Sequence, residues 1–154
     1  MASKTVILTG RTISNGQAEG EALVTREPVA WYNNAIDDTT GVIIKNGHEL
    51  EGMSLANKIF VFDTDIGSTG GALGVYNKVK NGVGPSAMIY REAHPISASG
   101  AVYAGIPAMD RINEGVPWEI IESGDWVKVD ATHGRIEVTK GGKPSEPASG
   151  DSDR

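Results

Sequence analysis

The sequence predicts an α/β protein, a compact β/β/α domain that is β-rich with one or two central helices. The 20 glycines spread along the chain indicate many short strands joined by tight turns. The segment 59–62 (Ile-Phe-Val-Phe) is continuously apolar, as expected of a strand covered on both faces. An amphipathic segment follows it, whereas both ends of the chain show strand patterns. These features fit a compact β/β/α domain better than a doubly wound nucleotide-binding fold.

The N-terminal part is predicted to be mostly β-structure. Ser14-Asn15-Gly16 has the composition of a hairpin turn, Pro28 interrupts the strand before it, and residues 29–41 form a loop. The strands expected here are 5–9, a second stretch to Ile13, 18–25 and 41–44.

The centre of the chain is predicted to be a βαβ unit. After the strand at 59–62, apolar residues recur with the i, i+3, i+4, i+7 spacing of a helix, at Ala72, Val75, Tyr76 and Val79. Asn81-Gly82 ends this helix, and residues 87–90 form the next strand. This order favours a parallel strand pair joined by a right-handed crossover.

The C-terminal part returns to β-structure. Ser97 is expected to cap a short helix that ends at Gly105, and a short strand follows at 106–109. Alternating residues over 125–130 and 135–138 predict a β-hairpin. We expect one domain over residues 1–140 and a disordered tail over 141–154, because the tail lacks large apolar residues.

Composition excludes several classes of function. The net charge of -6 disfavours nucleic acid as a partner, since like charges repel. The chain has no cysteine, so it forms no disulfide, has no cysteine nucleophile and binds no iron or zinc through thiolates. The apolar run 6–8 is too short for a signal peptide or a membrane helix, so we expect no membrane association and a cytoplasmic location.

The first candidate site is the glycine-rich segment 67–71, between the best strand and the best helix. Unpaired backbone N–H groups and the positive end of the helix dipole favour anions at such a place. The segment matches neither the phosphate-loop pattern nor the dinucleotide fingerprint. The alternative is that Ser68 or Thr69 only caps the helix and that the glycines allow close packing.

The second candidate is the segment 91–95, which follows the second core strand. Ligands of α/β sheets bind beyond the carboxyl ends of parallel strands, so this segment and Gly67 should share one edge. Arg91 suits a carboxylate and His94 an acid or base. The alternative is a solvated loop with a surface ion pair.

The remaining candidate residues, in the loop from Trp31 to Asp38 and at two histidines, show weaker signs of a functional site. Aromatic and amide side chains in the loop from Trp31 to Asp38 suit a site wall or a subunit interface, or cover the edge of the core. His48 and His133 lie near turns without metal-ligand spacing, so we interpret them as structural or solvated.

A series of short motifs resembles the small-subunit family of aconitase X. The opening Gly10-Arg11 with 18–24 matches its G-R…A-x-G-x-A-L-V pattern, and Gly67-Ser68-Thr69 resembles its G-S-[ST] turn. The further landmarks, in the same order, are 37–41, 48–52, Ser54-Leu55, 81–85, Gly100-Ala101 and 105–107. The resemblance covers roughly residues 10–138, which is more specific than any single motif.

The resemblance implies a swivelling β/β/α domain that pairs with a larger subunit. That subunit holds an iron or iron–sulfur centre, and the two chains together dehydrate a hydroxy acid such as cis-3-hydroxy-L-proline or mevalonate 5-phosphate. By similarity to aconitases, Ser68 is the base, and Gly67, Thr69 and Gly70 supply backbone and hydroxyl contacts. The metal would act as a Lewis acid on the departing hydroxyl. Arg91 and His94 are expected to contact substrate.

The sequence departs from the family pattern in two segments, and it also allows a rival hypothesis for the function. Asn34 and Ala35 stand where the family often has glycines, and 63–66 replaces a Pro-Gly-rich lead. The acidic Asp63 and Asp65 argue against a phosphorylated substrate bound by this chain alone. The rival hypothesis is a non-catalytic swivelling module that binds an anion at the Gly67 turn. A stand-alone enzyme is weaker still, because the sequence offers no metal site or obvious catalytic set.

Overall fold

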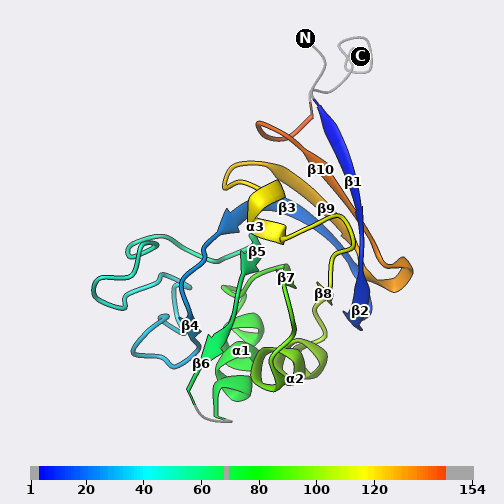
Figure 1. Cartoon of the computed structure of the whole chain (residues 1–154). Coiled ribbons are helices and arrows are strands. Elements are labelled where there is room, and N and C mark those ends of the chain that lie inside the picture. The colour runs from blue at the N-terminus through cyan, green and yellow to red at the C-terminus, as the bar shows by residue number, and fades with distance from the viewer. Residues whose placement is uncertain (1–3, 68–69, 145–154) are drawn as a thin grey trace, which may run out of the picture.

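The computed structural model describes residues 4–67 and 70–144 and has one large mixed sheet, one small sheet and three α-helices (Figure 1). In order across the large sheet, the strands are β1 (Thr5–Thr9), β10 (Arg135–Thr139), β9 (Trp126–Asp130), β3 (Gln17–Val24), β5 (Ile59–Phe62), β7 (Ala87–Tyr90), β8 (Ala108–Asp110) and β2 (Arg11–Ser14). The small sheet pairs β4 (Val29–Ala30) with β6 (Asp65–Ile66). The helices are α1 (Gly71–Lys80), α2 (Pro95–Ala104) and α3 (Pro117–Ile120), with a 3-10 turn at Ala131–His133.

The large sheet is curled, and its two edge strands are neighbours in the sequence. Strands β1 and β2 stand at opposite ends of the strand order, yet only Gly10 separates them in sequence. A Cβ at Gly10 would lie 2.8 Å from the carbonyl oxygen of Asp110, so a larger residue does not fit this corner. One continuous segment therefore pairs with β10 and then with β8, and closes the sheet into a barrel-like shape.

Strand β5 separates two hydrophobic cores, because its side chains alternate between the two faces of the sheet. Phe60 and Phe62 belong to the core under α1 and α2, where Trp31 packs edge-on against both rings at 5.9 Å. Ile59 and Val61 belong to the core inside the curled sheet. All four residues are fully buried, which confirms the predicted strand covered on both faces.

The predicted βαβ unit is confirmed. Strands β5 and β7 are parallel, with Ile59 opposite Ala87 and Phe62 opposite Tyr90, and α1 connects them. Helix α1 packs beside α2 on one side of the large sheet (Figure 1). The C-terminal hairpin of β9 and β10 is also confirmed.

Several local predictions are wrong. Ser14-Asn15-Gly16 does not close a hairpin, because β2 pairs with β8 and not with β3. In the strand expected at 41–44, Val42 and Ile43 form only isolated bridges. Helix α2 is capped by His94 at its N-terminus, not by Ser97, since Pro95 already suits the first helical position. Gly105 ends α2 as expected, and the strand expected at 106–109 lies at β8, whereas α3 was not predicted.

The expected disordered tail lies outside the described residues from position 145 onward, so that expectation stays a prediction. Within the described part of the chain, none of the helices has the length and apolar character needed to cross a membrane.

Candidate functional site

The candidate site lies at the carboxyl edge of the parallel strands β5 and β7. Because these strands are in register, the segments that follow them, 63–67 and 91–95, emerge at the same edge. Arg91 forms an ion pair with Asp63 at 3.2 Å across this edge. The expectation that the two candidate segments share one edge is therefore confirmed.

Gly67 has a backbone conformation and surroundings that suit only glycine. Its φ is +116°, and an added Cβ would lie 2.6 Å from Cε2 of Tyr32. The phenol ring of Tyr32 thus packs directly against the turn that leads to Ser68 and Thr69. These two residues lie outside the described part of the chain, and the next described residue, Gly70, precedes helix α1.

Asp65 fixes the segment that leads to Gly67. Its side chain is buried, and its carboxylate accepts hydrogen bonds from Trp31 Nε1 at 2.8 Å and from the backbone N–H of Ser97 at 3.0 Å. His94 Nδ1 lies 3.7 Å from the same carboxylate. Asp65 therefore ties the loop at Trp31 and the start of α2 to strand β6.

Arg91 and His94 line an open depression of about 410 Å³, together with Asp63, Thr64, Glu92, Ala93 and Pro95. The Arg91 guanidinium lies 5.4 Å from the ring centre of Trp118, and its side chain is 59% exposed. The ring of His94 accepts the N–H of Ile96 at 3.4 Å. The predicted pair is thus brought together, although the ion pair of the alternative interpretation is also present.

The buried hydroxyls of Tyr90 and Ser97 lie beneath this edge. Among the described residues, neither finds a partner in hydrogen-bonding geometry. Burial raises the pKa of Tyr90, while the nearby Ser97 hydroxyl acts in the opposite direction. Tyr90 therefore stays neutral and packs 5.1 Å from Phe62, centre to centre, as part of the aromatic core.

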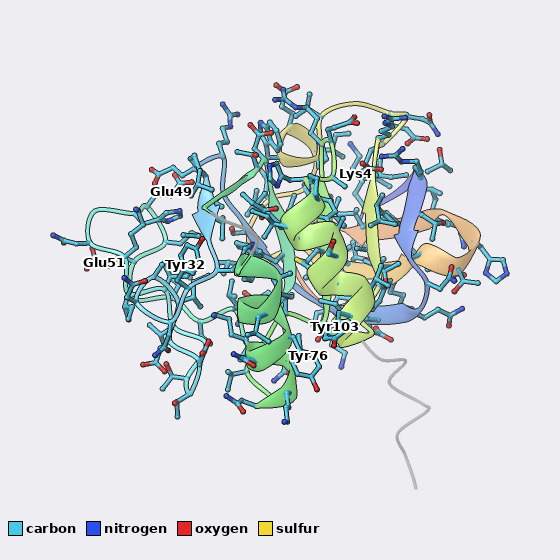
Figure 2. The ribbon with its side chains drawn as sticks, turned by 90° about the horizontal axis from the view of Figure 1, so that it is seen from below. Lys4, Tyr32, Glu49, Glu51, Tyr76 and Tyr103 are labelled. Carbon is cyan, nitrogen blue, oxygen red and sulfur yellow. The ribbon has the colours of Figure 1, made fainter. Side chains whose placement is uncertain are left out.

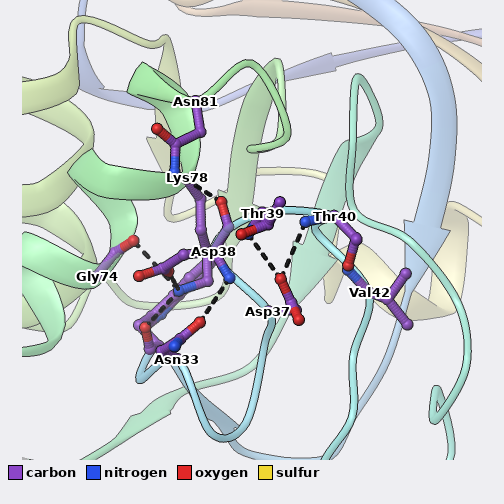
Figure 3. Close-up of polar contacts among 10 residues, drawn as sticks. Asn33, Asp37, Asp38, Thr39, Thr40, Val42, Gly74, Lys78 and Asn81 are labelled. Atoms are coloured by element: carbon purple, nitrogen blue, oxygen red, sulfur yellow. Dashed lines mark hydrogen bonds and ion pairs between the residues drawn. The ribbon is translucent and has the colours of Figure 1, made fainter.

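A buried lysine joins helix α1 to the loop that supplies Tyr32 (Figure 3). Lys78 is fully buried, and its Nζ donates to the carbonyl oxygen of Trp31 and to the Asp38 carboxylate, both at 2.7 Å. It also donates to the carbonyl oxygen of Gly74 at 3.3 Å. Asn81 adds a hydrogen bond of 2.8 Å to the carbonyl oxygen of Asp38. Desolvation lowers the pKa of Lys78, although Asp38 opposes this shift.

The remaining histidines carry no site. His48 is buried, its Nε2 lies 3.3 Å from the carbonyl oxygen of Pro28, and its Nδ1 accepts the N–H of Leu50. His133 is exposed and pairs with Asp130 at 2.9 Å. Both match the structural or solvated interpretation. Within the described ranges, no three His, Asp or Glu side chains are grouped to hold a metal ion.

A second groove opens along the same segment, next to Gly67. It has a volume of about 300 Å³ and is lined by Ala30, Tyr32, Asn34, Ala35, Lys45, Ile66 and Gly67. Tyr32 and Asn34 come from the third candidate segment, so that loop does form a wall of a groove. The sequence pattern does not identify Lys45, because its sequence neighbours carry no motif of a binding site.

Comparison with known proteins places the chain in a family. A model of the aconitase X swivel domain matches residues 7–138. Over 133 residues the chain is 41% identical to the phosphomevalonate dehydratase small subunit of Methanosarcina acetivorans, which covers 86% of this chain and 91% of that one. The identity to its namesake from Thermococcus sibiricus is also 41%, over 85% of this chain and 97% of that one.

Solved structures agree with the sequence comparison. The crystal structure of Thermococcus kodakaraensis aconitase X (holo-form) matches with a TM-score of 0.80 at 36% identity, covering 88% of this chain and 99% of that one. The solution NMR structure of a UPF0107 protein matches with a TM-score of 0.78 at 38% identity, covering 88% of this chain and 100% of that one. The resemblance seen in the sequence and the predicted fold class are both confirmed. This chain belongs to the aconitase X family and has the fold of its swivel domain.

Proposed function

We propose that the chain is the small subunit of a heteromeric hydro-lyase that removes water from mevalonate 5-phosphate. The names of the curated relatives at about 40% identity support this substrate over cis-3-hydroxy-L-proline. The observation that carries the proposal is the Gly67 turn, at the shared carboxyl edge of β5 and β7 with an open groove on it. We propose the cytoplasm as the location of this complex.

Ser68 is the proposed base. A serine hydroxyl is a weak base unless nearby donors stabilise its alkoxide, and unpaired N–H groups at the start of a helix can do this. Ser68 directly follows Gly67 and precedes the ten-residue helix α1, which supports such an arrangement. Gly67, Thr69 and Gly70 are the proposed oxyanion contacts around it.

Arg91 and His94 are the proposed contacts for the substrate carboxylate. Both line one depression at the same edge, and Arg91 is more than half exposed there. In the folded chain, Asp63 and Asp65 repel a phosphorylated substrate less than their sequence positions suggest. Asp63 is paired with Arg91, and Asp65 is buried on the donors Trp31 Nε1 and Ser97 N–H.

The proposed partner is a larger subunit that carries the iron or iron–sulfur centre. A cysteine-free chain cannot bind a cluster through thiolates, so these ligands come from another chain. The residues described here do not fit such a group, and the proposed contribution of this chain is limited to binding, orientation and proton transfer. The domain proposed for this role spans residues 1–140.

The test is Ser68→Ala in the complex with the larger subunit, purified from the native host with its iron content measured. We expect kcat for mevalonate 5-phosphate to fall by roughly 10²–10⁴-fold, as for loss of a general base. Ser99→Ala is the matched control, because Ser99 is exposed on α2 and lines neither groove at the site. Near-normal turnover by Ser68→Ala would refute the assignment, and a folded chain with no partner would favour the non-catalytic binding module.

A further inference from the structure

The groove beside Gly67 has the composition of an anion site. Its lining combines the apolar Ala30, Ala35 and Ile66 with three polar side chains, Tyr32, Asn34 and Lys45. None of these described lining residues is an aspartate or a glutamate. Figure 2 shows Tyr32 beside the loop that carries Glu49 and Glu51. The groove thus brings one positive charge and two neutral hydrogen-bonding groups to the Gly67 turn.

The positive charge of Lys45 is not neutralised by any carboxylate among the described residues. The side chain is exposed, and among the described residues no carboxylate forms an ion pair with it. The backbone is fixed at the groove, because the N–H of Lys45 donates to the carbonyl oxygen of Ala35 at 3.1 Å. Lys45 thus has a fixed backbone and, within residues 4–67 and 70–144, no carboxylate partner, so its charge is available to a ligand.

The two carboxylates of the same loop are engaged elsewhere. Glu49 accepts hydrogen bonds from the Thr25 hydroxyl and from the N–H of Arg26. Glu51 accepts the N–H of Gly47 at 3.1 Å. They therefore stabilise the loop itself and leave Lys45 free of an acidic neighbour in the groove.

The depression at Arg91 is less suited to a strongly charged group. Arg91 is already paired with Asp63, and Glu92 adds a second carboxylate to the lining. Two acidic groups around one arginine suit at most a singly charged ligand. A phosphate monoester carries nearly two charges at neutral pH and is matched well by the point charge of a lysine.

We propose that the groove of Tyr32, Asn34 and Lys45 binds the phosphate group of the substrate, with Lys45 as its charged partner. This inference rests on the proposed function, because it names where the phosphorylated end of that substrate lies. The phosphate sits beside Gly67, and the carboxylate end extends toward Arg91. The asymmetry of charge between the two grooves thus sets the direction of the substrate across the Gly67 turn.

The first experiment tests the groove without any enzymatic activity. The full chain, labelled with ¹⁵N, is titrated with inorganic phosphate at constant ionic strength, and backbone amide shifts are followed by NMR. We expect saturable shifts at Asn34, Lys45 and Gly67 that are lost in Lys45→Ala and retained in Lys45→Arg. Lys128→Ala is the matched control, because Lys128 is exposed and lines a groove of about 360 Å³ with Glu19 and Glu137. Shifts centred on 91–95, shifts that survive Lys45→Ala, or no saturable shift would each overturn the inference.

The second experiment measures turnover of mevalonate 5-phosphate by the complex with its larger subunit. We expect Lys45→Ala to raise KM by roughly 10–100-fold, as for loss of a hydrogen bond to a charged group, with kcat within about threefold. The control Lys128→Ala should leave both constants unchanged. A wild-type complex without this activity would refute the proposed function and leave the titration as the test of the groove. An active wild type with an unchanged KM in Lys45→Ala would refute the phosphate site alone.

Discussion

Replacing Lys78 by methionine tests whether the buried ammonium holds helix α1 to the loop at Trp31. Methionine keeps much of the length and apolar volume of lysine but removes all three hydrogen bonds of Nζ, to Trp31, Asp38 and Gly74. Breaking a buried ion pair costs about 3–5 kcal/mol. The Asp38 side chain is 25% exposed and can recover water, so we expect the lower end, about 3 kcal/mol.

The assay is thermal and urea unfolding followed by circular dichroism. A loss of about 3 kcal/mol should lower Tm by roughly 10 °C for a domain of this size. Lys80→Met is the matched control, because Lys80 is exposed on the same helix and should change stability by less than about 0.5 kcal/mol. If Lys78→Met also stays within that range, the ammonium does not hold the helix in place.

A double-mutant cycle separates the ion pair from the hydrogen bonds to carbonyl oxygens. Asp38→Asn combined with Lys78→Met should show a coupling of about 1–3 kcal/mol, since the two side chains are in direct contact. A coupling near zero would mean that the carbonyl oxygens of Trp31 and Gly74 account for the whole effect.

The pH dependence of the same variant has a defined sign. Burial lowers the pKa of Lys78 below its ordinary value of 10.5 in the folded chain. Between the lowered folded pKa and 10.5 the unfolded chain binds more protons, so the free energy of unfolding rises with pH in this window. The stability difference between wild type and Lys78→Met should therefore grow toward pH 10.5. A constant or shrinking difference would contradict the desolvated lysine.

Two further substitutions test the packing of α1 against Trp31 and the hydrogen bonds of the Asp125 carboxylate. Gly74→Ala should destabilise the chain by about 1–3 kcal/mol, because the added Cβ would collide with the carbonyl oxygen of Trp31. Urea unfolding measures this change. Equal or greater stability would show that α1 can move away from Trp31 at little cost. Asp125→Asn should remove stability that is present above pH 3.8 and is lost as the pH falls through the lower folded pKa. Although desolvation opposes it, hydrogen bonds from Lys140 and two backbone N–H groups lower the pKa of this carboxyl. We expect a loss of about 1–3 kcal/mol at neutral pH, and unchanged acid unfolding would contradict it.

The parts of the fold that the sequence predicts are those with a local periodicity. Strand β5, helix α1 and the hairpin of β9 and β10 each carry a pattern of apolar residues that matches their geometry. The shared edge of Asp63 and Arg91 also follows from the sequence, because parallel strands in a βαβ unit end on the same side.

The parts that the sequence does not predict depend on contacts between distant segments. On α1 the fully buried side of the helix includes Gly71, Gly74 and Lys78, whereas Ala72, Tyr76 and Val79 are only partly buried. Glycine leaves room for the backbone of Trp31, and a lysine is stabilised in a core only where carbonyl and carboxylate oxygens meet it. Neither condition is visible in the helix's own periodicity.

In the candidate site, too, the sequence predicts the residue that has a local pattern and misses the one that depends on distant segments. The sequence predicts Gly67 because its glycine turn joins a strand to a helix, whereas Lys45 contributes through a groove formed with Tyr32 and Ile66 from two other segments. The predicted hairpin at Ser14-Asn15-Gly16 is wrong for the same reason, because the pairing of β2 depends on a distant segment. Its partner β8 lies 99 positions away at the Arg11–Asp110 pair, beyond the reach of local turn patterns.

The corner at Gly10 has a consequence for how the chain folds during its synthesis. The segment 5–14 leaves the ribosome well before its partners β8 and β10 are made, because they lie about 100 and 130 positions later in the sequence. At roughly 5–20 residues per second, that segment waits on the order of ten seconds with unpaired backbone groups. Such an open strand is a template for pairing with other chains. Newly made chains thus expose the unpaired segment 5–14 to other chains until β8 and β10 are made, and any change that delays the hairpin of β9 and β10 lengthens that exposure.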